Sequence, residues 1–102
     1  MPPRSTWGDA SEAVGWHEKM TARDAWRWLP VEHRAAHLID AARAYLQADD
    51  PARAGRVLAD ADRMAPAEVR QRPAAREVLA QVIRDPRAPT TIVPLAAALG
   101  LS

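Results

Sequence analysis

Residues 44–66, AYLQADDPARAGRVLADADRMAP, constrain the fold more than any other stretch of this chain. A tyrosine near the start is followed by Asp49, Asp50 and Pro51, and a second proline, Pro66, ends the stretch. Proline is favoured in the first turn of a helix, where its missing N–H needs no partner, and an aspartate directly before it can cap the new helix. The segment therefore predicts the turn and the second helix of an antiparallel helical hairpin.

The composition also favours closely packed helices over a sheet. Of 102 residues, 23 are alanine and none is phenylalanine. Alanine has the highest helix propensity, and its small side chain lets helix axes approach closely. No segment alternates apolar and polar residues long enough to predict a strand. We therefore predict an all-α domain of four or five helices over residues 9–100, preceded by a tail over residues 1–8.

Helix boundaries follow from capping residues and prolines. A first helix is expected from Asp9, which can form a capping box with Glu12, to about Met20, and a short turn is expected before Pro30. Further helices are predicted at about 31–48, 51–64 and 73–84, with short turns at 66–69 and 94–99 and a loop over 85–94. The helical period predicts a core of Val31, Ala35, Leu38, Ile39, Ala42, Tyr45, Leu46, Ala54, Val57, Leu58, Ala61, Val78, Leu79, Val82 and Ile83.

The hairpin has the residue pattern of a known helical repeat. Leu38, Ala42 and Tyr45 precede the turn, and Ala54, Leu58, Ala61 and Pro66 follow it. In this pattern residues 38–66 resemble a tetratricopeptide (TPR) repeat. A weaker copy lies upstream, where residues 8–14 have the layout of residues 49–55. On this resemblance the chain is expected to be the end of a repeat array, with one complete repeat, half of another, and an open face near its N-terminal tryptophans.

A wider resemblance rests on LPVEHRA at 29–35, LIDAARAY at 38–45, APAEVR at 65–70, Pro73 and LAAALG at 95–100. With these runs, the stretch from Gly8 to Gly100 resembles the C-terminal part of actinobacterial helix-turn-helix (XRE-type) transcriptional regulators that carry TPR-like sensor domains. The resemblance implies a cytoplasmic interaction or sensor module. Such a module would bind a partner helix or peptide, or a second copy of itself as a homodimer.

The balance of charges argues against direct binding to nucleic acid. Fourteen basic residues are interleaved with thirteen acidic ones, for a net charge of +1. An alternative is a small DNA-associated regulator that contacts phosphates through arginines such as Arg70, Arg72 and Arg76. Glu68 and Glu77 flank this cluster, which favours an ordinary solvated face.

The sequence predicts neither an enzyme nor a membrane protein. There is no cysteine, so disulfides, thiolate nucleophiles and cysteine-type zinc sites are excluded. No apolar run approaches the ~20 residues that span a bilayer, and the N-terminus lacks the apolar core of a signal peptide. No catalytic motif or glycine-rich phosphate loop is present, and we expect no cofactor.

A metal-binding alternative centres on two histidines. His33 and His37 lie four residues apart on one predicted helix, and Asp40 follows three residues later, so the three could face one ion. The spacing is not that of a zinc-protease motif, and such groupings are common on solvated helix faces. The sequence therefore favours ordinary histidines and no metal.

Residues for partner binding are predicted in two places. Trp7, Trp16 and Trp28 are candidates for an interface, since tryptophan is enriched at binding hot spots. For Trp16 the competing expectation, packing in the core, is the stronger one, as it is for Trp26; Trp26 and Trp28 cannot both face inward from one short helix. Ile39, Arg43 and Gln47 occupy first-helix positions that line the concave groove of TPR proteins, where Arg43 could pair with a peptide carboxylate or with Asp40 beside it.

Overall fold

The computed structural model describes residues 6–22 and 24–101, with side chains over 12–22 and 26–101. These ranges contain six α-helices, two short 3₁₀ helices and no strand, which confirms the all-α class and corrects the predicted number of helices by one. In chain order the elements are α1 (Thr6–Ala22), η1 (Asp24–Trp28), α2 (Val31–Gln47), α3 (Pro51–Met64), α4 (Pro66–Gln71), α5 (Pro73–Val82), η2 (Thr90–Ile92) and α6 (Val93–Ala98).

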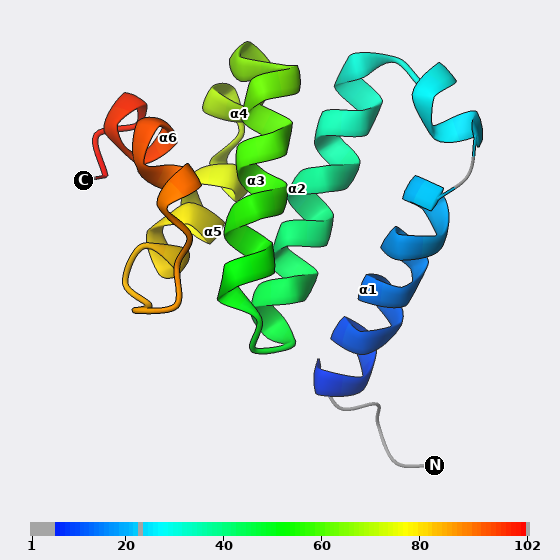
Figure 1. Cartoon of the computed structure of the whole chain (residues 1–102), viewed down its shortest axis with the longest axis horizontal. Helices are drawn as coiled ribbons and strands as arrows, with labels where there is room; N and C mark the ends of the chain where they lie inside the picture. The colour runs from blue at the N-terminus through cyan, green and yellow to red at the C-terminus, as the bar shows by residue number, and fades with distance from the viewer. Residues whose placement is uncertain (1–5, 23, 102) are drawn as a thin grey trace.

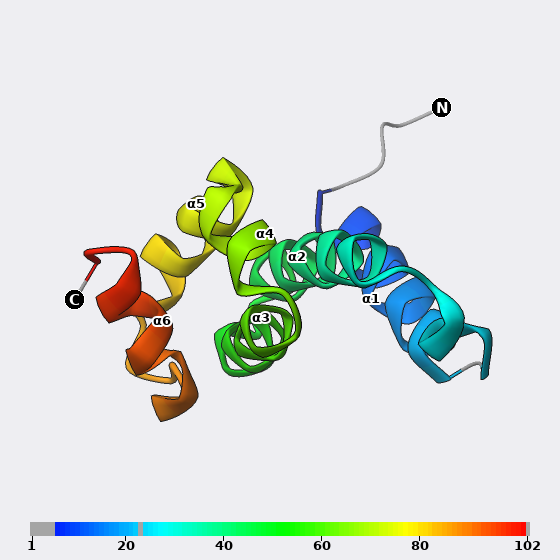
Figure 2. The same ribbon diagram turned by 90° about the horizontal axis from the view of Figure 1, so that it is seen from above.

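The antiparallel pair α2 and α3 lies at the centre of the molecule (Figure 1). Helix α1 packs along α2 on one side, while α4, α5 and η2 pack against α3 on the other. Seen from above, α1 and α6 lie at opposite ends of the arrangement (Figure 2). The central hairpin therefore has one long helix on one flank and a group of short helices on the other.

The turn between α2 and α3 is built as the sequence predicts. Asp50 caps α3, its Oδ1 accepting a hydrogen bond from the backbone N–H of Arg53 at 3.1 Å, and Pro51 occupies the first helical turn. Asp49 before it adopts the left-handed conformation, with φ 62°, that a glycine would adopt more easily. Arg87 donates to Asp49 Oδ1 at 2.8 Å, so the later loop is tied to this turn.

The core lies among α2–α6. Its buried side chains include most of the predicted ones: Ala35, Leu38, Ile39, Ala42, Tyr45, Ala54, Leu58, Ala61, Val78, Leu79 and Val82. Leu46, Val57 and Ile83 are only partly buried, and Val31 is 37% exposed, so its predicted burial is wrong. Of the described apolar side chains in α1, only that of Val14 packs against this core. Helix α1 therefore contributes little to it.

Two element boundaries differ from the sequence prediction. Helix α1 begins at Thr6, three residues before Asp9, so Asp9 lies inside the helix and is not its cap. Residues 1–5 of the predicted tail lie outside the described residues. The proline-containing loop is also more ordered than predicted, because η2 forms within it and buries Ile92. The last turn, predicted at 94–99, is present as α6 and ends before Gly100, a glycine with φ 70°.

Candidate functional site

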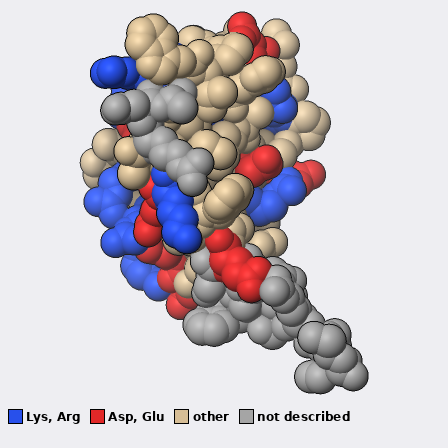
Figure 3. Space-filling view, turned by 90° about the vertical axis from the view of Figure 1, so that its right-hand side faces the viewer, with Lys and Arg blue, Asp and Glu red and all other residues tan. Residues whose placement is uncertain are grey.

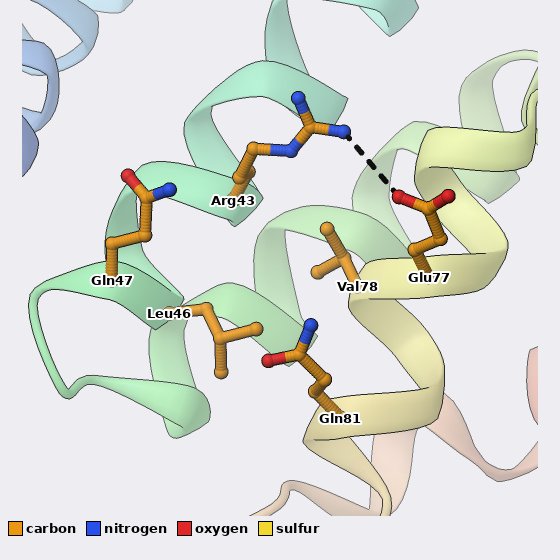
Figure 4. A pocket seen from close by; sticks show the side chains of 6 residues that line it. All are labelled: Arg43, Leu46, Gln47, Glu77, Val78 and Gln81. Carbon is orange, nitrogen blue, oxygen red and sulfur yellow. Dashed lines mark ion pairs between the residues drawn. The ribbon is translucent and has the colours of Figure 1, made fainter.

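A groove of about 190 Å³ opens between α2 and α5 (Figure 4). It is lined from α2 by Arg43, Leu46 and Gln47, and from α5 by Glu77, Val78 and Gln81. Leu46 and Val78 give it an apolar part, and the other four side chains surround that part with a guanidinium, a carboxylate and two amides. This combination of a small apolar surface with polar groups is typical of a site that holds a side chain and orients its polar end.

The ion pair between Arg43 and Glu77 in the groove is long and exposed to solvent. Arg43 Nη2 lies 3.9 Å from Glu77 Oε2, and the two side chains are 47% and 70% exposed. An ion pair this long and this hydrated contributes little stability, because water screens it and both side chains lose freedom in forming it. The guanidinium of Arg43 can therefore turn to another carboxylate at small cost. The neighbour predicted for Arg43 was Asp40, but the structure pairs it with Glu77 of α5.

Two of the three residues that the TPR resemblance assigns to a groove line the groove between α2 and α5. Arg43 and Gln47 are exposed and line the groove. Ile39 is 2% exposed and belongs to the core, so its assignment to a binding surface is wrong. Ile39 lies about one turn before Arg43, but its side chain is enclosed in the core whereas that of Arg43 lies at the exposed edge of α2.

The tryptophans divide between core and surface. Trp26 is partly buried, and its ring lies edge-on to His37 with centroids 5.2 Å apart, as expected for the inward member of its pair. Trp28 is 77% exposed and carries Arg27 over its ring at 5.6 Å. Trp16 is 58% exposed, so its predicted packing in the core is wrong and its alternative assignment to a surface fits better. The side chain of Trp7 lies outside the described residues.

The histidines do not assemble as the metal hypothesis requires. His33 is exposed, and His37 instead faces His17 of α1, with Nδ1 of His17 2.9 Å from Nε2 of His37 and the rings stacked. Over the described part of the chain, no three histidine or acidic side chains form a group suited to a metal ion. Asp40 is exposed and lines a small pocket beside both rings, together with Trp16.

His17 is a residue that sequence reasoning missed. This residue is 7% exposed. Among the described residues it is the only polar or charged side chain that is buried. Burial lowers the pKa of His17 below its ordinary value of 6.5, His37 lowers it further, and Glu18 opposes both. Burial likewise lowers the pKa of His37, against the attraction of Asp40. The only signal in the sequence was its spacing, three residues after Val14, on the inward stripe of the first helix.

A second polar contact between α1 and α2 involves Glu18, the residue after His17. The Tyr45 hydroxyl donates to Glu18 Oε1 at 3.2 Å, and Glu18 also faces Arg53 of α3 at 3.6 Å. Burial raises the pKa of Tyr45, and the charge of Glu18 raises it further. Among the described residues, the side chains that join α1 to the hairpin thus include a hydrogen bond and an ion pair beside the two histidine rings.

The predicted arginine cluster is engaged within the protein. Arg70 pairs with Asp62 at 3.1 Å, Arg72 pairs with Glu68 at 3.1 Å, and Arg76 donates to the carbonyl of Leu99 at 3.0 Å. The face of the molecule that shows α1 carries basic and acidic side chains side by side (Figure 3). These arrangements favour solvated faces held by local pairs over a phosphate-binding surface.

In comparisons with protein-family models, curated proteins and solved structures, nothing matches this chain. None of the helices in the described residues has the length and apolar character needed to cross a membrane.

Proposed function

We propose that this protein is a TPR-like interaction module of a transcriptional regulator and that it binds a segment of a partner protein in the groove between α2 and α5. The observation that carries the proposal is the groove itself. It places the loosely paired Arg43, the amides of Gln47 and Gln81, and the apolar side chains of Leu46 and Val78 around one opening. These groups are suited to binding and include no nucleophile paired with a base.

The arrangement of helices supports this assignment. Helix α5 packs against both helices of the α2–α3 hairpin. In a TPR array the first helices of successive repeats line the concave face. On the proposed assignment the hairpin would correspond to one repeat and α5 to the first helix of the next, and the groove residues of α2 and α5 face one another (Figure 4).

The chemistry of the groove defines the partner. A volume of about 190 Å³ accommodates one or two side chains of a bound segment, and not a folded domain. A carboxylate on that segment would replace Glu77 as the partner of Arg43 in a shorter, charge-assisted contact. The two glutamines offer both donors and acceptors to an extended backbone. The preferred partner is therefore an extended peptide with an acidic side chain beside an apolar one.

Substitution Arg43→Ala is expected to weaken binding of such peptides about tenfold or more, because a hydrogen bond to a charged group contributes about 1.5–3 kcal/mol. Heptapeptides selected against the purified chain from a random display library, then synthesised with a fluorescent label, provide the probes. Fluorescence anisotropy measures the dissociation constants. The control is Arg56→Ala, which removes an exposed arginine of α3 outside the groove and should leave affinity unchanged. Equal affinity of the selected peptides for the native chain and Arg43→Ala would rule out this site.

Self-association is a second candidate function, favoured by the exposed indoles of Trp16 and Trp28 at the α1 end. Burying two indoles between copies would remove a large apolar area from water. Sedimentation velocity at concentrations on the order of 100 µM is expected to show a dimer that the double variant Trp16→Ser/Trp28→Ser abolishes. Val93→Ser is the matched control, since Val93 is 61% exposed at the opposite end of the molecule. A native chain that sediments as a monomer at this concentration would exclude the dimer.

A further inference from the structure

The contact between α1 and α2 depends on an unusual pair of side chains. His17 Nδ1 and His37 Nε2 are 2.9 Å apart, which is a hydrogen bond in which one imidazole N–H donates to the lone pair of the other ring. One of these two nitrogens must therefore be unprotonated. A first proton can bind the other nitrogen of the donor ring, which leaves this hydrogen bond intact. A second proton must bind the accepting nitrogen, and two N–H groups then face each other without an acceptor.

Among the described side chains of α1, few apolar contacts hold the helix if this bond is lost. Val14 is the described apolar side chain of α1 that packs against the core, and Trp16 on the same helix is mostly exposed. Other contacts described between α1 and the hairpin are the edge-on contact of the His17 and Tyr45 rings and the polar contacts of Glu18 with Tyr45 and with Arg53. The attachment of α1 is therefore more sensitive to a change of charge than the packing of α3 or α5.

We propose that the His17–His37 pair is an acid-sensitive latch, so that double protonation releases α1 from α2 while the hairpin and the C-terminal helices stay folded. Release uncovers the side of α2 that carries His37, Ala41 and Tyr45, of which the last two are buried when α1 is docked. A partner surface hidden at neutral pH thereby becomes accessible in acid.

Other charged groups around the pair define the range of pH. Glu18 on α1 and Asp40 on α2 attract the imidazolium forms and favour uptake of the first proton. Arg53 of α3 pairs with Glu18 and reduces that attraction, and Arg34 lies one turn before His37 on α2. Tyr45, close to His17 with ring centroids 5.7 Å apart, stays neutral throughout.

The sign of the effect follows from the lowered pKa values of both histidines. A released α1 lets both rings titrate near the ordinary value of 6.5, whereas docking disfavours their charged forms. The released state therefore binds more protons, and docking is fully favourable above pH 6.5 and weakens as pH falls below it. Between pH 7.5 and pH 5.0 the ratio of released to docked molecules should rise at least about tenfold.

Spin labels can measure this release directly, because the chain contains no cysteine that would compete for labelling. Lys19→Cys on α1 and Arg56→Cys on α3 replace exposed residues and report the distance between the two helices. Pulsed electron–electron double resonance on EDTA-treated samples measures the distance between the two labels. The distance distribution should be narrow at pH 7.5, and broader with a longer mean distance at pH 5.0. A distribution that stays narrow at pH 5.0 would overturn the proposal.

Two histidine variants separate the latch from general acid effects. In the labelled background, His33→Gln removes an exposed histidine of the same helix and should keep the acid transition. The double variant His17→Gln/His37→Gln has no titrating ring at the contact, so its distribution should be the same at both pH values. Acid broadening of the double variant like that of the parent would contradict the assignment.

A separate measurement covers the case in which the double variant does not dock even at neutral pH. Imidazole ¹⁵N signals of the native chain, followed by nuclear magnetic resonance from pH 8 to pH 4.5, report each histidine. His17 and His37 should titrate below the ordinary value of 6.5, together with the loss of amide protection in α1. Titration of both residues at or above 6.5, with α1 still protected, would also overturn the proposal.

Discussion

Replacing Leu58 by alanine is expected to lower the free energy of unfolding by about 3 kcal/mol. Leu58 has no exposed surface and lies in α3, which packs against α2, α4 and α5. Truncation removes its apolar contacts and leaves a cavity that short neighbouring side chains cannot fill. Urea denaturation followed by far-UV circular dichroism measures the loss as a shift of the midpoint at constant slope.

An exposed valine provides the control for Leu58. Val93 at the start of α6 is 61% exposed, so Val93→Ala should change the free energy of unfolding by less than about 0.5 kcal/mol. A loss at Leu58 as small as that at Val93 would show that α3 is not enclosed between α2 and the C-terminal helices.

The substitution Gly55→Ala is expected to destabilise the protein by about 2 kcal/mol, although alanine is the better helix former. A Cβ atom at this position would lie 2.6 Å from Cδ and 2.7 Å from Cγ of Pro89, and 3.1 Å from Cγ2 of Ile92. A proline ring cannot rotate away, so the segment that carries η2 must move off α3. Thermal and urea denaturation of the variant should both show the loss.

The same substitution in α1 should have the opposite sign. A Cβ atom at Gly15 meets no atom within 4 Å, so Gly15→Ala should raise stability by up to about 1 kcal/mol through helix propensity. Stabilisation by both alanines would mean that η2 does not pack against α3 as closely as the structure shows.

Local chemistry explains which parts of the fold were predictable. Pro51, Pro66 and Pro73 each begin a helix at the predicted residue, because the fixed φ and missing N–H of proline suit the first turn of a helix. The inward faces of α2, α3 and α5 follow likewise from the 3.6-residue period. The hairpin was therefore readable from the chain itself.

The site depends on contacts that no local pattern contains. His17 and His37 are 20 residues apart, and they meet only because α1 lies along α2 at one particular register. The pairing of Arg43 with Glu77 depends in the same way on where α5 packs. Periodicity places Ile39 on the inward face, as observed, whereas the TPR resemblance assigned it to the groove. Neither pattern indicates how far a side chain at the edge of a helix face, such as Trp16, is covered.

Small and large buried side chains contribute to the core in different ways. Four alanines of the hairpin, Ala35 and Ala42 on α2 and Ala54 and Ala61 on α3, have no exposed surface. Such positions hold almost no side-chain volume that could be lost, but any larger residue there would force its neighbours apart. Buried leucines such as Leu58, Leu79 and Leu95 instead fill volume that truncation would leave empty. The core thus has two kinds of position with opposite tolerance: one rejects enlargement, and the other rejects truncation.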